Sequence, residues 1–331
     1  MVKNIVKTNT TKNNPEICFL EVEPEDEKLV KAKFPQARIF NKILSEKEII
    51  KQCKGAEIIC PFIYSKITRK VIESLPDLKL IVTRSVGYDH IDLASAKEKD
   101  IIVCNVPDYG SHVIAEYVFA LLLSGLRHVV EGDERVEREK KFYFSGLRGI
   151  ALKGKNLGII GTGKIGRNVA RIASSGFLMN VFAYDSHPDK KIASECHFSY
   201  TDLKTVWKKS DIITLHCPLL DSTKHLINKK SISAMKNGVV IVNTSRGGVI
   251  ETDALTQGLK SKKISYALLD VLEHENNIKE NKELLNLPNV IVTPHIAFYA
   301  DDSMGKMYSE AFATINSFIQ KKKVINQVQG L

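Results

Sequence analysis

Short apolar runs alternate with amphipathic stretches along most of the chain. In the first third, the runs at 17–22 (ICFLEV), 78–85 (LKLIVTRS) and 100–106 (DIIVCNV) have the length and β-branched content of buried strands. Stretches with helical spacing of apolar residues separate them. Strands that alternate with helices indicate βα units, which assemble into a parallel sheet. This region therefore predicts a compact α/β domain.

A second series of alternating elements occupies the rest of the chain, and residues 302–323 predict a C-terminal amphipathic helix. Between the two series, residues 112–140 are apolar in their first half and charged in their second. That pattern predicts one long helix with a buried start and an exposed end, which could bridge two domains or enter a subunit interface. The predicted fold class is α/β, with two Rossmann-like or flavodoxin-like domains built on parallel sheets.

A glycine-rich loop opens the second series, and it consists of Gly161, Thr162, Gly163, Lys164, Ile165 and Gly166. It follows an apolar strand and opens a helix, as the pyrophosphate loop of a dinucleotide-binding fold does. Asp185 closes the next strand, where a carboxylate can accept both ribose hydroxyls and would repel a 2′-phosphate. The loop and Asp185 predict NAD as the cofactor, in preference to NADP.

Three candidate catalytic residues follow three consecutive predicted strands: Arg246, Glu275 and His295. The carboxyl ends of parallel strands share one edge of a sheet, so we expect the three side chains in one crevice. Hydride transfer to a ketone needs a cation for the substrate carboxylate, a general acid, and a partner that tunes that acid. The set predicts interconversion of a 2-keto and a 2-hydroxy acid, with His295 as proton donor and acceptor.

Composition narrows the class of protein. The chain has a formal net charge of +10, but its lysines are scattered, so we interpret the charge as a solvated surface and expect no nucleic-acid partner. Six cysteines without a C-x-x-C pair indicate reduced, buried thiols, and we expect no metal site. No apolar run approaches the roughly 18 residues of a membrane span, and the polar start has no signal-peptide hydrophobic region. We expect a cytoplasmic protein without a membrane partner.

Several motifs together resemble the D-isomer-specific 2-hydroxyacid dehydrogenase family, from about residue 17 to 322. They are RSVGYDHID (84–92), NVPDYGSHVIAEYVFALLL (105–123), LGIIGTGKIGR (157–167), MKNGVVIVNTSRGGVI (235–250), ALLDVLEHE (267–275) and TPHIAFYADDS (293–303). The resemblance implies a discontinuous substrate domain (residues 1–108 and 301–331) and an inserted NAD-binding Rossmann domain (residues 109–300). It places the active site in the cleft between them. It also implies a homodimer through the coenzyme domain, which suits the apolar helix at 112–126.

The resemblance assigns roles to individual residues. Arg246, Glu275 and His295 match the family's catalytic triad. The backbone N–H groups of Val86 and Gly87 match those that hold the substrate carboxylate, and Asp270 matches the residue that faces the nicotinamide carboxamide. The matching cofactor-lining positions are His216, Cys217, Pro218 and Thr244.

The stretch LDVLEHE contains two candidate acids, Glu273 and Glu275. The family's acid aligns with the second. Formate dehydrogenase relatives are similar but have a Gln there, so Glu275 favours keto-acid chemistry. Asn276 stands where many relatives have Pro, and we expect this difference to change only the local loop shape.

Aromatic residues bear on the choice of substrate. Tyr109, Phe298 and Tyr299 resemble the D-lactate dehydrogenase branch, in which an aromatic residue beside the catalytic His shapes a small pocket. Tyr109 either hydrogen-bonds the substrate or packs at a domain hinge. Phe62 and Tyr64 either face the substrate or pack in the core. We predict a D-lactate dehydrogenase-like enzyme that forms the D-hydroxy acid.

Three alternatives remain open. The same triad would serve a glyoxylate or hydroxypyruvate reductase. A phosphoglycerate dehydrogenase-like enzyme is less favoured, because many add a C-terminal regulatory domain that we do not expect after the last helix here. An NAD-sensing corepressor-like binding protein is a remote alternative, because those proteins usually carry long disordered tails and the polar tail here is short.

Overall fold

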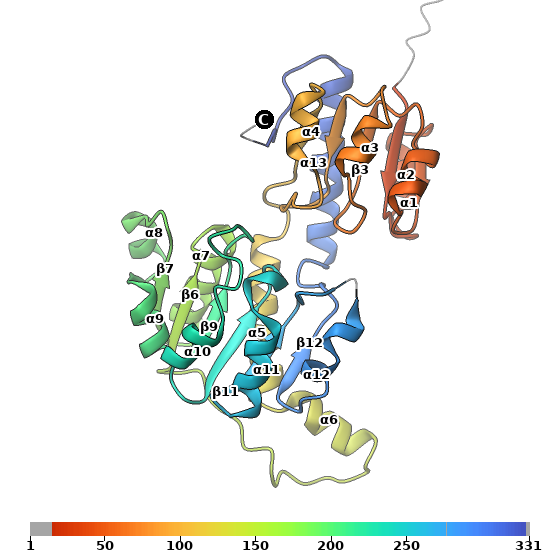
Figure 1. The fold of residues 1–331 in the computed structure, drawn as a ribbon. Helices are drawn as coiled ribbons and strands as arrows, with labels where there is room; N and C mark the ends of the chain where they lie inside the picture. The colour runs from red at the N-terminus through yellow and green to blue at the C-terminus, as the bar shows by residue number, and fades with distance from the viewer. Residues whose placement is uncertain (1–14, 276, 329–331) are drawn as a thin grey trace, which may run out of the picture. The chain divides into compact units, whose positions relative to one another are not determined.

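The computed structural model describes residues 15–275 and 277–328, which form two compact units (Figure 1). The first unit comprises the chain up to Tyr109 together with Asp301 onward, and the second runs from Gly110 to Ala300. Each contains a parallel β-sheet, which confirms the predicted α/β fold class. The polar N-terminal tail and Asn276 lie outside the described residues.

The first unit has a five-stranded parallel sheet in the order β2-β1-β3-β4-β5. Its strands are β1 (Ile17–Leu20), β2 (Arg38–Phe40), β3 (Ile58–Cys60), β4 (Leu80–Val82) and β5 (Ile102–Cys104). Its helices are α1 (Glu27–Lys33), α2 (Glu46–Gln52), α3 (Arg69–Glu73), α4 (Leu93–Glu98) and the C-terminal α13 (Asp301–Ile319). The order of the strands is that of flavodoxin-like folds.

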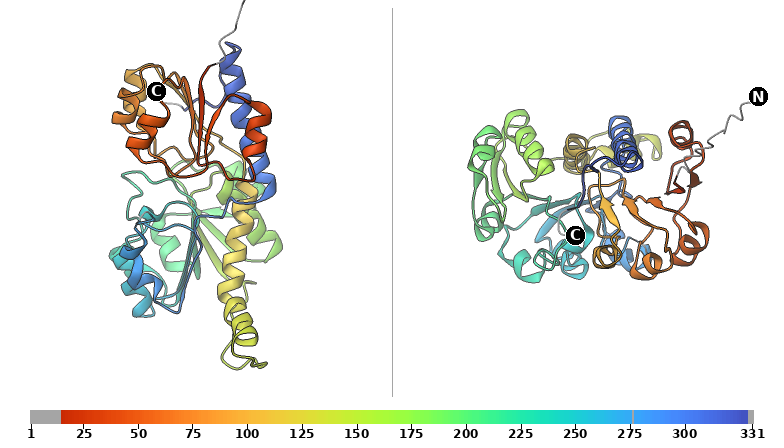
Figure 2. Two further views of the ribbon diagram at one scale, coloured as in Figure 1. Left: turned by 90° about the vertical axis from the view of Figure 1, so that its right-hand side faces the viewer. Right: turned by 90° about the horizontal axis from the view of Figure 1, so that it is seen from above.

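Helix α13 belongs to the first unit although it comes from the far end of the chain. The ring of Phe312 on α13 lies 5.9 Å from that of Phe19 on β1 and 5.3 Å from that of Phe34, which follows α1. Figure 2 shows the blue α13 alongside the red α1. Edge-to-face aromatic packing of this kind stabilises a core beyond the area it buries.

The second unit has a seven-stranded parallel sheet in the order β12-β11-β10-β9-β6-β7-β8. Its strands are β6 (Asn156–Ile160), β7 (Asn180–Tyr184), β8 (Ser199–Tyr200), β9 (Ile212–Leu215), β10 (Val239–Asn243), β11 (Ile264–Leu269) and β12 (Val290–Val292). Its α-helices are α5 (Ser111–Leu126), α6 (Val129–Glu137), α7 (Lys164–Arg171), α8 (Lys190–Glu195), α9 (Leu203–Lys209), α10 (Lys229–Ala234), α11 (Thr252–Lys260) and α12 (Lys282–Leu285). Short turns of other helix types are η1 (Ile172–Gly176), η2 (Gly247–Val249) and η3 (Ile278–Asn281).

Both faces of this sheet are buried. Ile159 packs with α5, α7 and α8 on one face, and its neighbour Ile160 packs with α9, α10 and α11 on the other. This alternation explains the continuous apolar runs of the strands. The strand order reverses between β6 and β9, and in an open α/β sheet such a switch point is where ligands bind, beyond the carboxyl ends of the strands.

The prediction of a single helix over residues 112–140 is wrong, because two helices, α5 and α6, occupy this range. The chain bends by 57° between α5 and α6, at His128, which has a left-handed φ of 52°. The apolar residues of α5 lie in the core of their own unit, among them Val118 and Leu122. The apolar character of residues 112–126 therefore reflects packing inside the unit, and the expected subunit interface does not follow from it.

Among the described residues, no single helix is long and apolar enough to cross a membrane, and only the bent pair α5–α6 passes that test jointly.

Candidate active site

The glycine loop connects β6 to α7. Gly161 has a left-handed φ of 93°, and a Cβ there would lie 2.7 Å from the carbonyl carbon of His216 on the neighbouring strand end. A Cβ on Gly166 would overlap the carbonyl oxygen of Gly161. A Cβ on Gly163, in contrast, would meet no atom within 4 Å. The first and third glycines are thus required by the turn itself, and the second leaves open space at the helix N-terminus, where a pyrophosphate fits.

The other loop residues divide by side-chain environment. Thr162 is buried and Lys164 is exposed at the start of α7. The side chain of Ile165 packs against the core. Its backbone N–H is therefore the group that can meet a phosphate, since the first N–H groups of a helix lack intrahelical partners.

Asp185 directly follows β7 and is held by its neighbours. Its carboxylate accepts hydrogen bonds from the Thr162 N–H (2.6 Å), the Thr162 hydroxyl (2.9 Å) and the His187 N–H (2.9 Å). Burial alone would raise the pKa of Asp185, but these hydrogen bonds outweigh it and lower the pKa. Tyr200, which the sequence did not single out, lies 2.8 Å from the Thr162 hydroxyl. Asp185 is therefore ionised and fixed beside the glycine loop, as a ribose-binding carboxylate requires.

Two polar atoms near the switch point lack partners among the described residues. The Nε2 atom of His216 lies 2.9 Å from the Thr214 hydroxyl, while its buried Nδ1 has no hydrogen-bond partner there. Burial lowers the pKa of His216 to about 3, so the ring is neutral. The buried Thr244 hydroxyl, just after β10, is likewise unpaired. Buried polar groups are normally hydrogen-bonded, so these two fit a ligand that supplies polar partners, as NAD does.

The two residues after His216 differ from each other. Cys217 is buried in the core beneath α9 and α10, and Pro218 is exposed. The backbone N of Cys217 would lie 2.8 Å from a Cβ at Gly161, so this strand end closes directly on the glycine loop.

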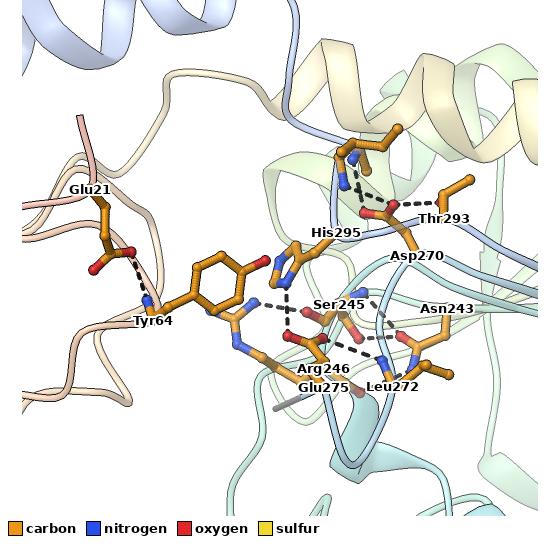
Figure 3. Close-up of polar contacts among 12 residues, drawn as sticks. Glu21, Tyr64, Asn243, Ser245, Arg246, Asp270, Leu272, Glu275, Thr293 and His295 are labelled. Atoms are coloured by element: carbon orange, nitrogen blue, oxygen red, sulfur yellow. Dashed lines mark hydrogen bonds and ion pairs between the residues drawn. The ribbon is translucent and has the colours of Figure 1, made fainter. Parts of the chain in front are cut away.

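The predicted triad comes from three adjacent strand ends, because β10, β11 and β12 are neighbours in the sheet. His295 Nδ1 lies 3.2 Å from Glu275 Oε2, and Glu275 Oε1 accepts a hydrogen bond from the Leu272 N–H (Figure 3). Arg246, after β10, donates to the Ser245 carbonyl at 2.8 Å. A carboxylate beside an imidazole nitrogen fixes the orientation of the ring. The His295–Glu275 pair is the geometry that a general acid needs.

Gly247 brings the Arg246 loop against the Glu275 loop. A Cβ at Gly247 would overlap the backbone carbonyl of Leu272, and it would also clash with the N atom of Glu273. Only glycine permits this approach. Gly247, which follows Arg246, therefore packs directly against Leu272 and Glu273, in the segment that leads to Glu275.

Asp270 holds the His295 loop. Its buried carboxylate accepts hydrogen bonds from the Thr293 hydroxyl (2.6 Å), the Ile296 N–H (2.9 Å) and the Ala297 N–H (2.8 Å), and burial raises its pKa. His295 itself has a left-handed φ of 57°, and its N–H donates to the Asp270 carbonyl. The expected role of Asp270 beside the nicotinamide stays a prediction. What the structure shows is that this carboxylate binds the Thr293 side chain before His295 and the backbone N–H groups of Ile296 and Ala297 after it.

The two acids of the LDVLEHE stretch have different contacts. Glu275 contacts His295, whereas Glu273 contacts Thr252 and His225. Of the two candidates, Glu275 is therefore the one beside the predicted proton donor.

The aromatic residues after His295 contact each other and the His295 ring. The Phe298 ring is buried and lies edge-on to the His295 ring, with centroids 6.4 Å apart. Tyr299 packs edge-on against Phe298 and is 44% exposed. Phe298 thus supplies an apolar wall beside His295.

The predicted substrate residues of the first unit are Val86 and Gly87, which follow β4, and Tyr109, the last residue of the unit's first segment. The Val86 carbonyl accepts from the Asn105 side chain and the Gly87 carbonyl from Ser85 Oγ. No hydrogen bond from the Val86 or Gly87 N–H is found among the described residues. The carbonyls are fixed and the N–H groups remain available, which suits a carboxylate-binding loop. Tyr109 is buried at the end of the unit's first segment.

The glycine loop at the switch point, the fixed Asp185 and the His–Glu pair fit an NAD-dependent dehydrogenase. The family model described as "D-isomer specific 2-hydroxyacid dehydrogenase, NAD binding domain" matches residues 119–297. The chain belongs to this family, its cofactor is NAD, and it is an oxidoreductase.

Similar proteins span most of the chain. The "2-hydroxyacid dehydrogenase homolog 2" of Schizosaccharomyces pombe is 37% identical, covering 85% of this chain and 88% of that protein. A hydroxypyruvate reductase of Thermotoga maritima is 39% identical and covers 79% and 84%. The crystal structure of an Aquifex aeolicus D-lactate dehydrogenase, complexed with NAD and lactic acid, has 34% identity and a TM-score of 0.87, covering 96% and 100%.

Proposed function

We propose that this enzyme interconverts a small 2-oxo acid and its D-2-hydroxy acid, in the manner of a D-lactate dehydrogenase. The observation that carries the proposal is the His295–Glu275 pair, set beside Arg246 on neighbouring strand ends and lined by the Phe298 ring. An aromatic wall next to the proton donor favours a short substrate side chain. The similarity to a D-lactate dehydrogenase that binds lactic acid supports this choice.

Each residue has a defined task in the proposed reaction. The Arg246 guanidinium binds the substrate carboxylate and polarises its carbonyl. Bound NADH supplies the hydride. His295 gives its proton to the substrate oxygen as that oxygen becomes an alkoxide, and takes the proton back in the reverse direction. Glu275 stabilises the protonated imidazole and holds its orientation.

A substrate panel tests the proposal. NADH oxidation is followed with pyruvate, glyoxylate, hydroxypyruvate, phenylpyruvate and 2-ketoisocaproate, and the product is assigned by chiral chromatography. We expect the highest kcat/KM with pyruvate and a D-product. A preference for glyoxylate or hydroxypyruvate would instead favour the reductase alternative, which the Thermotoga maritima relative supports. An L-product would contradict the proposal outright.

We further propose a homodimer, with the surface at residues 129–150 as its interface. Phe142 and Phe144 are 93% and 90% exposed, and Val129, Val130 and Val136 on α6 are exposed as well. The loop is held in place by Arg135, which donates to the Tyr143 and Ser145 carbonyls. An ordered surface with this much apolar exposure is typical of a protein interface.

Light scattering coupled to gel filtration checks the assembly. The unaltered protein should elute with twice the mass of one chain, and the double variant Phe142→Ser/Phe144→Ser should elute as a monomer. A monomeric unaltered protein would contradict the proposal.

We also propose a cytoplasmic location. All six cysteines are free and buried, which suits a reducing compartment. Cell fractionation would test this directly.

A further inference from the structure

A second His–Glu pair lies directly behind the Glu275 loop. The Glu273 carboxylate accepts hydrogen bonds from the Thr252 N–H (3.0 Å) and hydroxyl (2.8 Å), and its other oxygen pairs with His225 Nε2. The Glu273 side chain is only 17% exposed. One carboxylate thus ties together the loop after β11, the start of α11 and the segment before α10.

The backbone at this carboxylate touches both arms of the proposed active site. Leu272 and Glu273 are the residues against which Gly247 closes, and Gly247 directly follows Arg246. The Leu272 N–H also donates to Glu275 Oε1. The placement of residues 272–273 therefore sets the position of Arg246 relative to Glu275.

His225 is attached to the Arg246 turn as well. Its N–H donates to the Gly248 carbonyl at 2.9 Å, and its own carbonyl accepts from the Asn228 side chain at 2.8 Å. These contacts hold it in a left-handed conformation with φ of 50°. The backbone of His225 thus binds Gly248 in the Arg246 turn, and its side chain binds Glu273, against which Gly247 of the same turn packs. His225, Gly248, Gly247 and Glu273 thus form a closed cycle of contacts next to Arg246.

We propose that His225 and Glu273 are positioning residues that set the distance between Arg246 and the His295–Glu275 pair. The inference rests on the proposed function, because it assigns Arg246 to the substrate carboxylate. Neither residue touches the reacting atoms in this scheme. Loss of the His225–Glu273 pair lets Arg246 move relative to the substrate carboxylate that it binds. A displacement of about 1 Å in a binding group can cost up to about 100-fold in rate.

The main variant is His225→Asn. Asn is well tolerated at left-handed positions and removes the imidazole donor, so backbone strain does not confuse the result. His225→Gln returns a side-chain N–H of similar reach and is the rescue variant. The matched control is His197→Asn, because His197 has a φ of 55°, is exposed, and makes no ion pair with a carboxylate among the described residues.

The kinetic readout is the split between KM and kcat. For His225→Asn we expect KM for the 2-oxo acid to rise about tenfold, kcat to fall less than about threefold, and the Kd for NADH to stay unchanged. His225→Gln should recover most of the KM, and His197→Asn should match the unaltered enzyme. A purely structural role would lower Tm and leave KM and kcat unchanged at assay temperatures, and that outcome overturns the inference.

A second measurement does not depend on turnover. The Nε–H signal of Arg246, assigned with Arg246→Lys in ¹⁵N-arginine-labelled protein, reports on its surroundings. It should shift in His225→Asn and return in His225→Gln. If the unaltered enzyme reduces none of the 2-oxo acids but the signal still moves, the proposed function fails and the positioning role stands. If the enzyme is active and the signal does not move, the positioning role fails.

Discussion

The two His–Glu pairs of the second unit are built from the same parts and differ in how many donors each carboxylate satisfies. Both histidines have left-handed backbones, with φ of 57° at His295 and 50° at His225, and their acids lie two residues apart in one loop. Glu273 is bonded to Thr252 twice and to His225, whereas Glu275 accepts one backbone hydrogen bond beside His295. A saturated carboxylate serves to hold segments together, and a less saturated one can serve chemistry.

The titration of Glu273 agrees with this difference. Burial alone would raise the pKa of Glu273, but the hydrogen bonds from His225 and Thr252 outweigh it and lower the pKa. Glu273 is consequently a permanent anion near neutral pH. In the loop after β11, the Glu273 carboxylate thus serves the structure, and the Glu275 carboxylate, two positions later, serves the proposed chemistry.

The largest expected effect is at His295. His295→Ala should lower kcat by about 100- to 10,000-fold, because the proton donor is lost. The Kd for NADH, measured by fluorescence quenching, should stay the same, since the glycine loop and Asp185 are untouched. A kcat within threefold of the unaltered enzyme would remove His295 from the mechanism.

Glu275→Gln should have the next largest effect. The amide keeps the shape of the side chain but removes the charge that stabilises the protonated imidazole, so we expect kcat/KM to fall about 10- to 100-fold. Steady-state kinetics with pyruvate measures this. If Glu273→Gln lowers kcat more than Glu275→Gln does, the roles of the two acids are reversed.

Glu273→Gln should raise the KM for the 2-oxo acid, as His225→Asn does, and should also lower stability in a way that depends on pH. Because the folded-state pKa of Glu273 lies below its unfolded value, the ionised carboxylate stabilises the fold above about pH 4.3, and that contribution is lost as pH falls through the folded value. We expect the variant to lose about 1–2 kcal/mol at pH 7, with the difference shrinking as the pH falls below about 4.3. Urea unfolding at several pH values measures it. A difference that stays constant as the pH falls would point to lost packing instead of lost charge.

The sequence was sufficient for the features that depend on local pattern. The strands β6, β9 and β10 are buried on both faces, so their apolar runs stand out, and the glycine loop carries its own signature. The edge strands β2 and β8 were not predicted. They have only three and two residues and are partly exposed, so neither length nor periodicity marks them.

Contacts between distant segments could not be predicted from the sequence. The choice of Glu275 over Glu273 came from the family resemblance, because spacing alone fits both. The His225–Glu273 pair joins residues 48 positions apart, and the Tyr200–Thr162 contact joins residues 38 apart. Each depends on how two loops meet after the sheet has formed. The break between α5 and α6 at His128 was also missed. The sequence changes there from apolar to charged, and that change is equally typical of one continuous helix with a buried start and an exposed end.

The approach at Gly247 has a consequence for how this enzyme can change over evolutionary time. Any side chain at that position would push the Arg246 loop away from Leu272, so selection for activity should accept only glycine in a library randomised there. The exposed residues Leu220, Asp221 and Ser222 bear no such restriction. A change in substrate range is therefore expected to arise through replacements such as Phe298, whose ring can vary in size without separating the two loops.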